Sequence, residues 1–366
     1  MTTTVLCTVG TRPEAIKMAP VIRALRGDPA FRCVVLATAQ HRALLDQVLE
    51  LFGIVPDADL DIMQPDQSLG TLTGRLMLRL DATLADLRPD IILGQGDTTT
   101  VLTAALAAFY RGIPFGHVEA GLRTGDLQSP FPEELNRILT ARMARWHFAP
   151  TDAAAAALLA EGYSPDTIHV TGNTVIDALN LVRGLPAPSV LPPMPGKRRL
   201  LVTLHRRENF GPPLARICAA LDRLVADNPD LDLMIPTHPN PNVRGTLIRH
   251  FAGRAQVTVC EPMGYAEFIA AMRSATLILS DSGGVQEEAP ALGKPVLVLR
   301  DTTERPEAVA AGVARLVGTD AEGIRAAAQG LLDDPDAYAR MAQHRSPYGD
   351  GNAAARIVSV LRRDLG

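Results

Sequence analysis

Short apolar runs alternate with longer amphipathic segments along most of the chain. The apolar runs stand at residues 5–9, 33–37, 91–93, 115–118, 168–170, 200–204, 231–235, 257–260, 277–279 and 296–299. Segments with helical spacing fill most of the gaps, for example at 15–26, 43–51, 98–110 and 214–227. Because strands that alternate with helices pair in parallel and are covered by those helices, the pattern predicts an α/β fold with parallel sheets flanked by helices.

One segment near the middle of the chain interrupts this alternation. Residues 183–199, RGLPAPSVLPPMPGKRR, are dense in proline and glycine and have no hydrophobic period, as is typical of a linker. A chain of 366 residues is also long enough for two cores. We therefore expect two Rossmann-like domains, at 1–182 and 200–350, facing across a cleft. The last segment, 351–366, is expected to form a helix that packs back on the first domain.

The composition excludes several classes of protein. The net charge is −4 and no polybasic run is present, so neither nucleic acid nor an anionic membrane surface is an expected partner. No apolar run approaches the roughly 20 residues that cross a bilayer, and the first residues enter a strand without a signal-peptide pattern. The four cysteines are scattered and form no CxxC motif or Cys/His cluster, so we expect buried reduced thiols and no metal site. A cytoplasmic location follows from these features.

The loop after the first predicted strand, GTRPEAIKMAP at 10–20, carries two cations at the start of a helix. Arg12 and Lys17 lie near that helix N-terminus, where cations oppose the helix dipole. Their placement therefore favours contact with an anion over a role as surface charges. In a later loop, GQGDTTT, Asp97 follows another predicted strand, where its carboxylate either caps the next helix or takes part in chemistry.

The long loop HVEAGLRTGDLQSPFPEELNR, at 117–137, is rich in acids. Glu119 directly follows a predicted strand, so its carboxylate is expected to face the cleft. Glu133 or Glu134 starts a helix after a proline, where an acid also favours the helix dipole. Long irregular loops in compact domains tend to be functional, so these acids are candidates both for acid–base chemistry and for helix stabilisation.

The second half of the chain supplies a candidate anion site. In SDSGGVQEEAP an apolar strand ends in small residues, Ser282 to Gly284, and a helix follows, so that backbone N–H groups and the helix dipole favour a phosphate. In LHRRENFG, His205 ends a strand beside two arginines, where it suits phosphate binding or acid–base chemistry. With carboxylates in the other half, these loops indicate a nucleotide-diphosphate ligand. The GxGxxG fingerprint is absent, so NAD is not indicated and no cofactor is expected.

Nine segments, in the same order along the chain, resemble the non-hydrolysing UDP-N-acetylglucosamine 2-epimerases. They are GTRPEAIKMAP, TAQHR, GDTTT, GHVEAGLRTGD, SPFPEELNR, GNTVIDAL, HRRENFG, DSGGVQEEAPALGKPVLVLRDTTERPEAV and PYGDG, and the match runs from residue 6 to about residue 360. The resemblance implies a GT-B architecture of two domains, a homodimer, and no nicotinamide or metal. It also implies reversible conversion of UDP-GlcNAc to UDP-ManNAc, which supplies sugars to bacterial surface polysaccharides.

The implied reaction begins with cleavage of the C1–O bond. UDP departs, the C2 proton is lost to leave 2-acetamidoglucal, and UDP then adds back while a proton reaches the other face. By the same resemblance, Asp97, Glu119 and Glu133 match acids that transfer protons around the sugar, and His205 assists the departure of UDP. The resemblance leaves open which carboxylate serves which face.

The resemblance also implies which residues contact the UDP-sugar. They are Arg12, Lys17, Asp97, Glu119, His205, Phe268, Ser282, Gly283, Gly284, Glu288 and Arg305. Within this set, Arg12, His205 and residues 282–284 match positions that hold the phosphates. Glu288 matches the acceptor of the ribose hydroxyls, and Phe268 matches a position at the uracil pocket.

Many bacterial members bind a second UDP-GlcNAc as an activator beside the active site. Gln40, Arg206 and His238 fit that allosteric pocket, whereas Ala43 and Asp66 stand where other polar or arginine contacts are usual. Further departures are Met263, Leu204 and Gln95, at positions where relatives often carry Gln, Gly or Ala, and His, respectively.

Four alternatives remain open from the sequence. A hydrolysing epimerase would release free ManNAc and UDP, and a related epimerase would act on a UDP-diacetamido sugar. A GT-B glycosyltransferase would move GlcNAc to an acceptor, which the acid-rich loop around Glu119 and Glu134 disfavours. A non-catalytic binder of sugar nucleotides would not need Asp97, Glu119 or Glu133.

Overall fold

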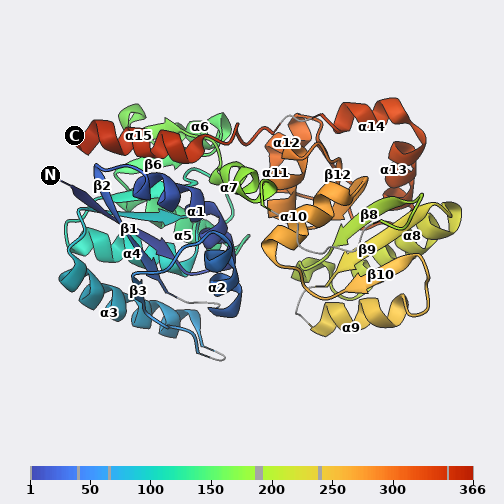
Figure 1. Ribbon diagram of the computed structural model, residues 1–366, viewed down its shortest axis with the longest axis horizontal. Coiled ribbons are helices and arrows are strands. Elements are labelled where there is room, and N and C mark those ends of the chain that lie inside the picture. The colour runs from blue at the N-terminus through green and yellow to red at the C-terminus, as the bar shows by residue number, and fades with distance from the viewer. Residues whose placement is uncertain are drawn as a thin grey trace. The chain divides into compact units, whose positions relative to one another are not determined.

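The computed structural model describes residues 2–38, 42–64, 67–185, 193–237, 241–343 and 346–365. The chain divides into two compact units. Unit 1 comprises Met1–Leu181 and Tyr348–Gly366, and unit 2 comprises Val182–Pro347. Each unit is built on one parallel sheet covered by helices, which confirms the predicted α/β class with two Rossmann-like sheets (Figure 1).

Unit 1 contains a seven-stranded parallel sheet in the order β3-β2-β1-β4-β5-β6-β7. The strands are β1 (Thr3–Val9), β2 (Phe31–Ala37), β3 (Ala58–Asp59), β4 (Ile91–Gln95), β5 (Phe115–Val118), β6 (Trp146–Ala149) and β7 (Ile168–Val170). The helices are α1 (Arg12–Arg26), α2 (Arg42–Leu51), α3 (Leu69–Leu87), α4 (Thr99–Tyr110), α5 (Glu133–Met143), α6 (Asp152–Ala160), α7 (Thr174–Arg183) and α15 (Ala353–Leu365), with a 3₁₀ turn at Pro165–Thr167. The sheet order reverses direction after β1, so the loops after β1 and β4 meet at the switch point where α/β sheets bind ligands.

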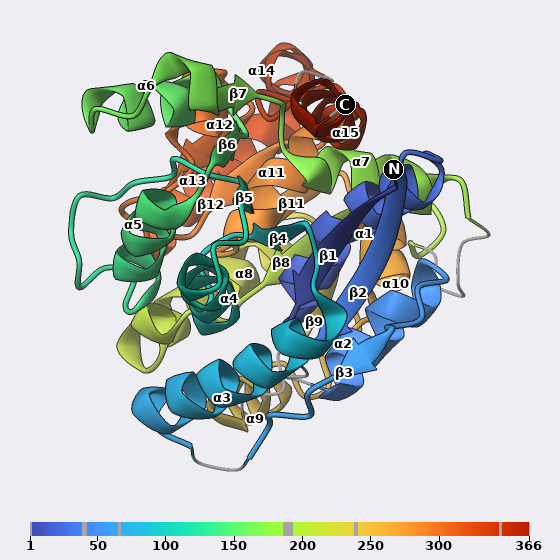
Figure 2. The ribbon, with the colours of Figure 1, turned by 90° about the vertical axis from the view of Figure 1, so that its left-hand side faces the viewer.

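Two layers of helices cover this sheet. Helices α3, α4 and α5 pack side by side on one face, and α1, α2 and α15 pack on the other (Figure 2). The spacing of apolar residues explains the first layer, because Leu72, Leu76, Leu80 and Leu84 recur every four residues on α3 and are all buried. The β1 strand is buried on both faces, as expected for a central parallel strand.

The last helix belongs to unit 1. The Asp177 carboxylate on α7 accepts hydrogen bonds from the backbone N–H groups of Ala353 (3.2 Å) and Ala354 (2.9 Å), at the start of α15. The indole of Trp146 donates to the carboxylate of Asp364 at 2.8 Å, near the end of the helix. The segment that follows unit 2 in the chain is thus capped at one end and tied to the sheet at the other.

Unit 2 contains a six-stranded parallel sheet in the order β10-β9-β8-β11-β12-β13. The strands are β8 (Arg198–Thr203), β9 (Leu231–Pro236), β10 (Val257–Cys260), β11 (Leu277–Ser280), β12 (Val296–Val298) and β13 (Ala314–Leu316). The helices are α8 (Pro212–Asp227), α9 (Pro241–His250), α10 (Tyr265–Ser274), α11 (Gly283–Ala291), α12 (Pro306–Ala310), α13 (Ala321–Asp333) and α14 (Pro335–Met341), with a 3₁₀ turn at Arg207–Asn209. Apolar residues of α8 and α13 form the main core against one face of the sheet.

All ten predicted strands occur, and three further strands do not stand out in the sequence. The β3 and β13 strands have only two and three residues, and β6 carries His147 among its apolar residues. The β8 strand begins at Arg198, within the segment predicted as linker, because Arg199 is buried in an ion pair with Asp232 at 2.7 Å. Residues 186–192 of that segment lie outside the described residues.

Candidate active site

The loop after β1 is held in place by a buried carboxylate. Glu14, 1% exposed, accepts a hydrogen bond from the Gly10 N–H at Oε2 (3.1 Å) and one from the Thr98 hydroxyl at Oε1 (2.8 Å). Burial raises the pKa of Glu14 to about 7, although these hydrogen bonds and those from Thr11 act in the opposite direction. The sequence offers an ordinary explanation for an acid in the first turn of a helix, so Glu14 was not among the predicted residues.

Gly10 is required at the end of β1 by its surroundings. A Cβ atom at this position would lie 2.5 Å from the hydroxyl oxygens of both Thr38 and Thr100. These two hydroxyls are 3.0 Å apart and close the space behind the loop. The chain can therefore turn from β1 into α1 with the backbone close to its neighbours, and this turn presents Arg12 at the first position of the helix.

Lys17 and Glu119 contact each other in unit 1. The ammonium nitrogen of Lys17 lies 2.5 Å from Oε2 of Glu119, and the two side chains are only 10% and 7% exposed. Glu119 has a φ of +65°, in the left-handed region that non-glycine residues rarely adopt. Such backbone geometry in a buried charged pair at a strand end is typical of functional sites. The structure thus brings together two predicted site residues that are 102 positions apart.

Asp97 follows β4 and is oriented by α5. Its Oδ2 lies 2.5 Å from Nη2 of Arg137, and its backbone carbonyl accepts a hydrogen bond from Nδ2 of Asn136 at 2.8 Å. The N-cap of α4 is Thr98, whose hydroxyl accepts from the Val101 N–H, so the capping alternative for Asp97 is wrong. The carboxylate of Asp97 is 27% exposed and remains at the surface of the loop.

The two acids at the start of α5 differ in their surroundings. Glu134 is fully buried, and its Oε1 accepts hydrogen bonds from the backbone N–H groups of Thr124 (2.9 Å) and Gly125 (3.1 Å). Its Oε2 lies 3.1 Å from Nη1 of Arg137, so this side chain organises the long loop and the arginine that holds Asp97. Glu133, in contrast, is partly exposed at the first position of the helix. Among the two, Glu133 is the acid that a ligand can reach.

His117 supports the turn that carries Asp97. The imidazole is fully buried on β5, and Nε2 lies 2.8 Å from the carbonyl oxygen of Gly96. Burial is the main cause that lowers the pKa of His117 to about 3, so the ring is neutral and donates its proton from Nε2 to that carbonyl. Gly96 has a φ of +83°, and the hydrogen bond therefore fixes a left-handed turn directly before Asp97. The sequence pattern gives no sign of this contact.

In unit 2, His205 contacts a buried acid that follows β11. Nδ1 of His205 lies 2.8 Å from Oδ1 of Asp281, and the two side chains are 35% and 0% exposed. Asp281 also accepts the backbone N–H groups of His205 and Arg206. Asp281 was not predicted from the sequence, where it stands among small residues of the candidate anion site.

The start of α11 has the geometry predicted for an anion site. Ser282 is the N-cap residue, and its side chain makes no capping hydrogen bond within the described part of the chain. The Ser282 N–H donates to the Ser280 hydroxyl at 3.0 Å, which in turn lies 2.6 Å from the Thr203 hydroxyl. The N–H groups of Gly283 and Gly284 thus begin a helix that no side chain caps, as in phosphate-binding helix N-termini.

The two acids of α11 have separate partners. Glu287 is buried and forms an ion pair with the predicted site residue Arg305. Glu288, 6% exposed, accepts a hydrogen bond from the hydroxyl of Tyr265 on α10 at 2.8 Å. Phe268 stands three positions after Tyr265 on the same helix and is partly exposed. Tyr265 was not predicted, because only the folded structure shows its contact with Glu288.

The predicted allosteric residues are described only in part. Arg206 donates to Glu304 at 2.8 Å, and Glu304 also pairs with Arg300, which donates to Glu208 at 2.7 Å. Burial raises the pKa of Glu304, but the two arginines and a backbone hydrogen bond lower it to about 2. This network joins the loops after β8 and β12. Gln40, Asp66 and His238 lie outside the described residues, as does the side chain of Ala43.

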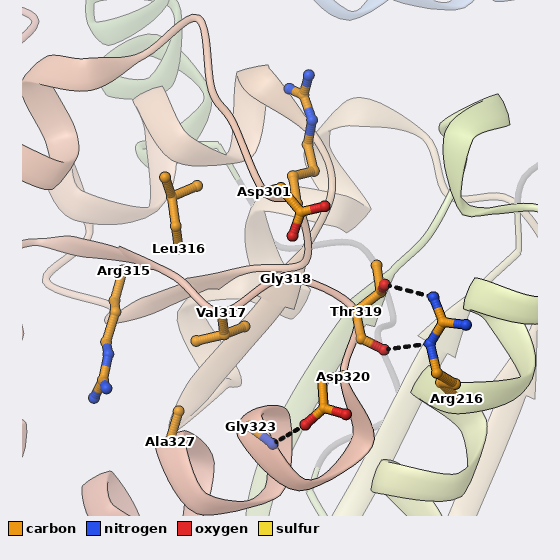
Figure 3. Close-up of a pocket in the computed structure, with 11 residues that line it drawn as sticks. Arg216, Asp301, Arg315, Leu316, Val317, Gly318, Thr319, Asp320, Gly323 and Ala327 are labelled. Carbon is orange, nitrogen blue, oxygen red and sulfur yellow. Dashed lines mark hydrogen bonds between the residues drawn. The ribbon is translucent and has the colours of Figure 1, made fainter.

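A separate hollow of about 550 Å³ lies at the carboxyl ends of β12 and β13 (Figure 3). Its lining includes Arg216, Arg300, Asp301 and Arg315, but none of the predicted site residues. The guanidinium of Arg216 donates to both the carbonyl and the hydroxyl of Thr319, as the dashed lines show. Arg216 therefore already has hydrogen-bond partners in this hollow, and Arg300 forms ion pairs with Glu208 and Glu304.

The residues that the structure describes contain no group of three or more His, Cys, Asp or Glu side chains that could hold a metal ion. Among the helices in the same ranges, none is both long and apolar enough to cross a membrane.

Comparison with known proteins gives consistent matches over the whole chain. The model of the UDP-N-acetylglucosamine 2-epimerase family matches residues 23–362. The UDP-N-acetylglucosamine 2-epimerase of Salmonella typhimurium is 51% identical over an alignment of 368 residues that covers 98% of each chain. The crystal structure of the UDP-GlcNAc 2-epimerase from Neisseria meningitidis bound to UDP-GlcNAc has a TM-score of 0.92 at 46% identity, and covers 98% of this chain and 100% of that one. The S. aureus MnaA–UDP co-structure has a TM-score of 0.92 at 43% identity, with 99% and 97% covered.

Proposed function

Because the chain belongs to the UDP-N-acetylglucosamine 2-epimerase family, we propose that it interconverts UDP-GlcNAc and UDP-ManNAc without releasing free sugar. The observation that carries the proposal is the 51% identity to the Salmonella enzyme over 98% of both chains. The groups described in each unit support it, because unit 1 has several ordered carboxylates and unit 2 has a helix N-terminus that no side chain of the described residues caps. Members of the family solved with UDP-GlcNAc or UDP have the same fold.

Unit 2 would hold the nucleotide diphosphate. The N–H groups at the start of α11 would bind the phosphates together with His205, and Glu288 would accept the ribose hydroxyls. Tyr265 supports this role of Glu288, because its hydroxyl donates to Oε1 and thereby orients the carboxylate. Arg305, held by Glu287, would add positive charge to the phosphate site.

The reaction would proceed by elimination and addition. The C1–O bond breaks and UDP departs with the bonding electrons, while a carboxylate removes the C2 proton to leave neutral 2-acetamidoglucal. In the reverse step UDP attacks C1 and a proton is delivered to the opposite face of C2. This scheme needs proton carriers on both faces, and Asp97, Glu119 and Glu133 are the candidates in unit 1.

The surroundings of these acids fit proton transfer. Arg137 and Asn136 fix Asp97, and Lys17 fixes Glu119, so each carboxylate has a defined orientation at a strand end. The buried Glu134 anchors the loop, which leaves Glu133 accessible on the same helix. Mobile surface acids would not be held in this way.

One experiment in D2O tests the reaction. UDP-GlcNAc is incubated with the protein, and C2 deuteration, free UDP and free ManNAc are followed by NMR. We expect deuterium at C2 and an equilibrium mixture with UDP-ManNAc. Stoichiometric free ManNAc would instead identify a hydrolysing epimerase, and the absence of C2 exchange would identify another sugar or another class. A lag in turnover of UDP-ManNAc that trace UDP-GlcNAc removes would identify an activator site.

We also propose that the protein is a homodimer whose product supplies surface polysaccharides. Support for the dimer comes from large apolar side chains exposed on adjacent helices of unit 1, such as Phe109 (63%) and Tyr110 (67%) on α4 and Leu139 (41%) on α5. Light scattering of the wild-type protein and of Leu139→Glu tests this surface, because a charge there should weaken the dimer.

A further inference from the structure

Strand pairing in unit 2 places an acid directly beside His205. The β8 and β11 strands run parallel with Thr203 opposite Ser280, so the residues that follow each strand emerge side by side. Asp281 is completely buried at this point, whereas the His205 ring is 35% exposed. The Nδ1 edge of the imidazole therefore faces a buried carboxylate, while the side chain as a whole is partly exposed.

The hydrogen bonds around Asp281 determine where protons lie. Oδ2 accepts from the backbone N–H groups of His205 (3.0 Å) and Arg206 (3.0 Å) and from Nδ2 of Asn209 (3.0 Å). Oδ1 accepts from the same His205 N–H at 3.1 Å and lies 2.8 Å from Nδ1 of the ring. All other partners can only donate, so Asp281 is surrounded by donors. Its burial would raise its pKa, but the contacts with His205 and Arg206 hold that pKa below its usual value.

An ionised carboxylate has no proton to give, so Nδ1 of the imidazole must carry one. We propose that Asp281 is a positioning residue, which keeps the proton of neutral His205 on Nδ1 and thereby confines the exchangeable proton of the ring to Nε2. The catalytic use of the Nε2 proton rests on the proposed function, whereas the position of the other proton, on Nδ1, does not.

In the elimination, Nε2–H of the protonated ring donates its proton to a phosphate oxygen of the departing UDP. The electron pair of the C1–O bond goes to UDP, and the ring becomes neutral with its remaining proton on Nδ1. When UDP adds back, Nε2 recovers the proton. Asp281 stabilises the imidazolium and holds the ring plane through both steps, as a buried carboxylate does in other acid–base pairs with histidine.

Asp281→Asn separates this role from a role in holding the loop. The amide oxygen will occupy the place of Oδ2, because the amide nitrogen there would face Arg206 N–H and Asn209 Nδ2, which are both donors. The amide nitrogen then faces Nδ1 and donates to it, which moves the ring proton to Nε2. The loop keeps its three hydrogen bonds to the oxygen at the Oδ2 position and loses only the second, longer contact of His205 N–H with Oδ1, but the tautomer is inverted. Asn209→Ala is the matched control, since it removes a donor to the same carboxylate without touching the ring.

Two measurements decide the outcome. The ¹⁵N NMR spectrum of protein labelled in its histidine rings reports the tautomer, with His205 assigned by its loss in His205→Gln. We expect Nδ1–H in the wild type and in Asn209→Ala, and Nε2–H in Asp281→Asn. We also expect kcat for epimerisation to fall about 10²-fold or more in Asp281→Asn, with KM changed less than about threefold, whereas Asn209→Ala should lose less than about tenfold.

Several results would overturn the assignment. An Nε2–H tautomer in the wild-type protein would do so even if Asp281→Asn failed to fold. An inverted tautomer with unchanged kcat would remove the catalytic consequence, and a loss confined to KM and UDP affinity would reduce Asp281 to a structural residue. Absence of wild-type turnover of UDP-GlcNAc would contradict the proposed function instead, and the spectrum would still decide the position of the Nδ1 proton.

Discussion

Glu14 should make unit 1 less stable as the pH rises from about 4.5 to about 7. The carboxyl is 1% exposed, and burial raises its pKa from 4.5 to about 7. Between these values the folded state keeps a proton that the unfolded state releases, so stability falls with increasing pH. Below about pH 4.5 both states are protonated, and above about pH 7 both are ionised, so the change is confined to this window. A difference of about 2.5 pH units corresponds to about 3 kcal/mol in the free energy of unfolding.

Glu14→Gln removes this dependence while keeping the packing. The amide oxygen can accept from Gly10 N–H, and the amide nitrogen can donate to the Thr98 hydroxyl, which reverses one hydrogen bond without losing it. The difference in unfolding free energy between the variant and the wild type should therefore shift by about 3 kcal/mol in favour of the variant between pH 4.5 and pH 8. Other titrating groups cancel in this difference.

The chain's single tryptophan provides the assay. Trp146 lies on β6 of unit 1 and is 2% exposed, so its fluorescence during urea unfolding reports on this unit. Glu50→Gln, at an exposed position on α2, is the matched control for loss of a carboxyl. The reasoning would be refuted if the difference in unfolding free energy between Glu14→Gln and the wild type stayed constant across the pH range. It would also be refuted if Glu14→Gln were less stable than the wild type at pH 8.

Three other substitutions have definite expected outcomes. Arg199→Met should lower the free energy of unfolding of unit 2 by about 3–5 kcal/mol, because it leaves Asp232 buried without this ion pair. Urea unfolding followed by circular dichroism measures the loss, and a double variant with Asp232→Leu should recover most of it. Equal losses in the single and the double variant would contradict this. Tyr265→Phe removes one hydrogen bond to Glu288 and should weaken UDP binding about tenfold by calorimetry, with kcat changed less; unchanged affinity would show that Glu288 needs no support. Asp97→Asn should slow C2 deuterium exchange by about 10²-fold or more while UDP binding is retained, and undiminished exchange would exclude Asp97 from proton transfer.

The sequence predicts the architecture well because it depends on local pattern. Apolar runs and helical spacing identify the central strands, and turn residues mark the strand ends where functional groups gather. The β8 strand overlaps the last two residues of the predicted linker, because Arg198 and Arg199 lack the apolar pattern of a strand. Arg199 is buried in a strand only because Asp232 lies on the neighbouring strand, and a partner 33 residues away is not visible in a local pattern.

The sequence suggests candidate site residues by their type, but it does not show which residues they contact. The sequence offered capping or chemistry for Asp97, and only the structure shows that Thr98 caps the helix. It offered both Glu133 and Glu134, and the buried contacts of Glu134 with the loop distinguish them. Asp281 stands beside residues that were predicted, but its contact with His205 follows from strand register.

The return of α15 to unit 1 has a consequence for the order in which the protein is made. The first unit needs Ala353–Leu365, which leave the ribosome after all of unit 2. Until then, Asp177 has no helix to cap and Trp146 has no carboxylate to bind. Unit 2 is continuous in sequence and can be completed first, although its synthesis starts later. Unit 1 is therefore finished last, although its synthesis begins first, and a nascent chain can have unit 2 folded before unit 1 is complete.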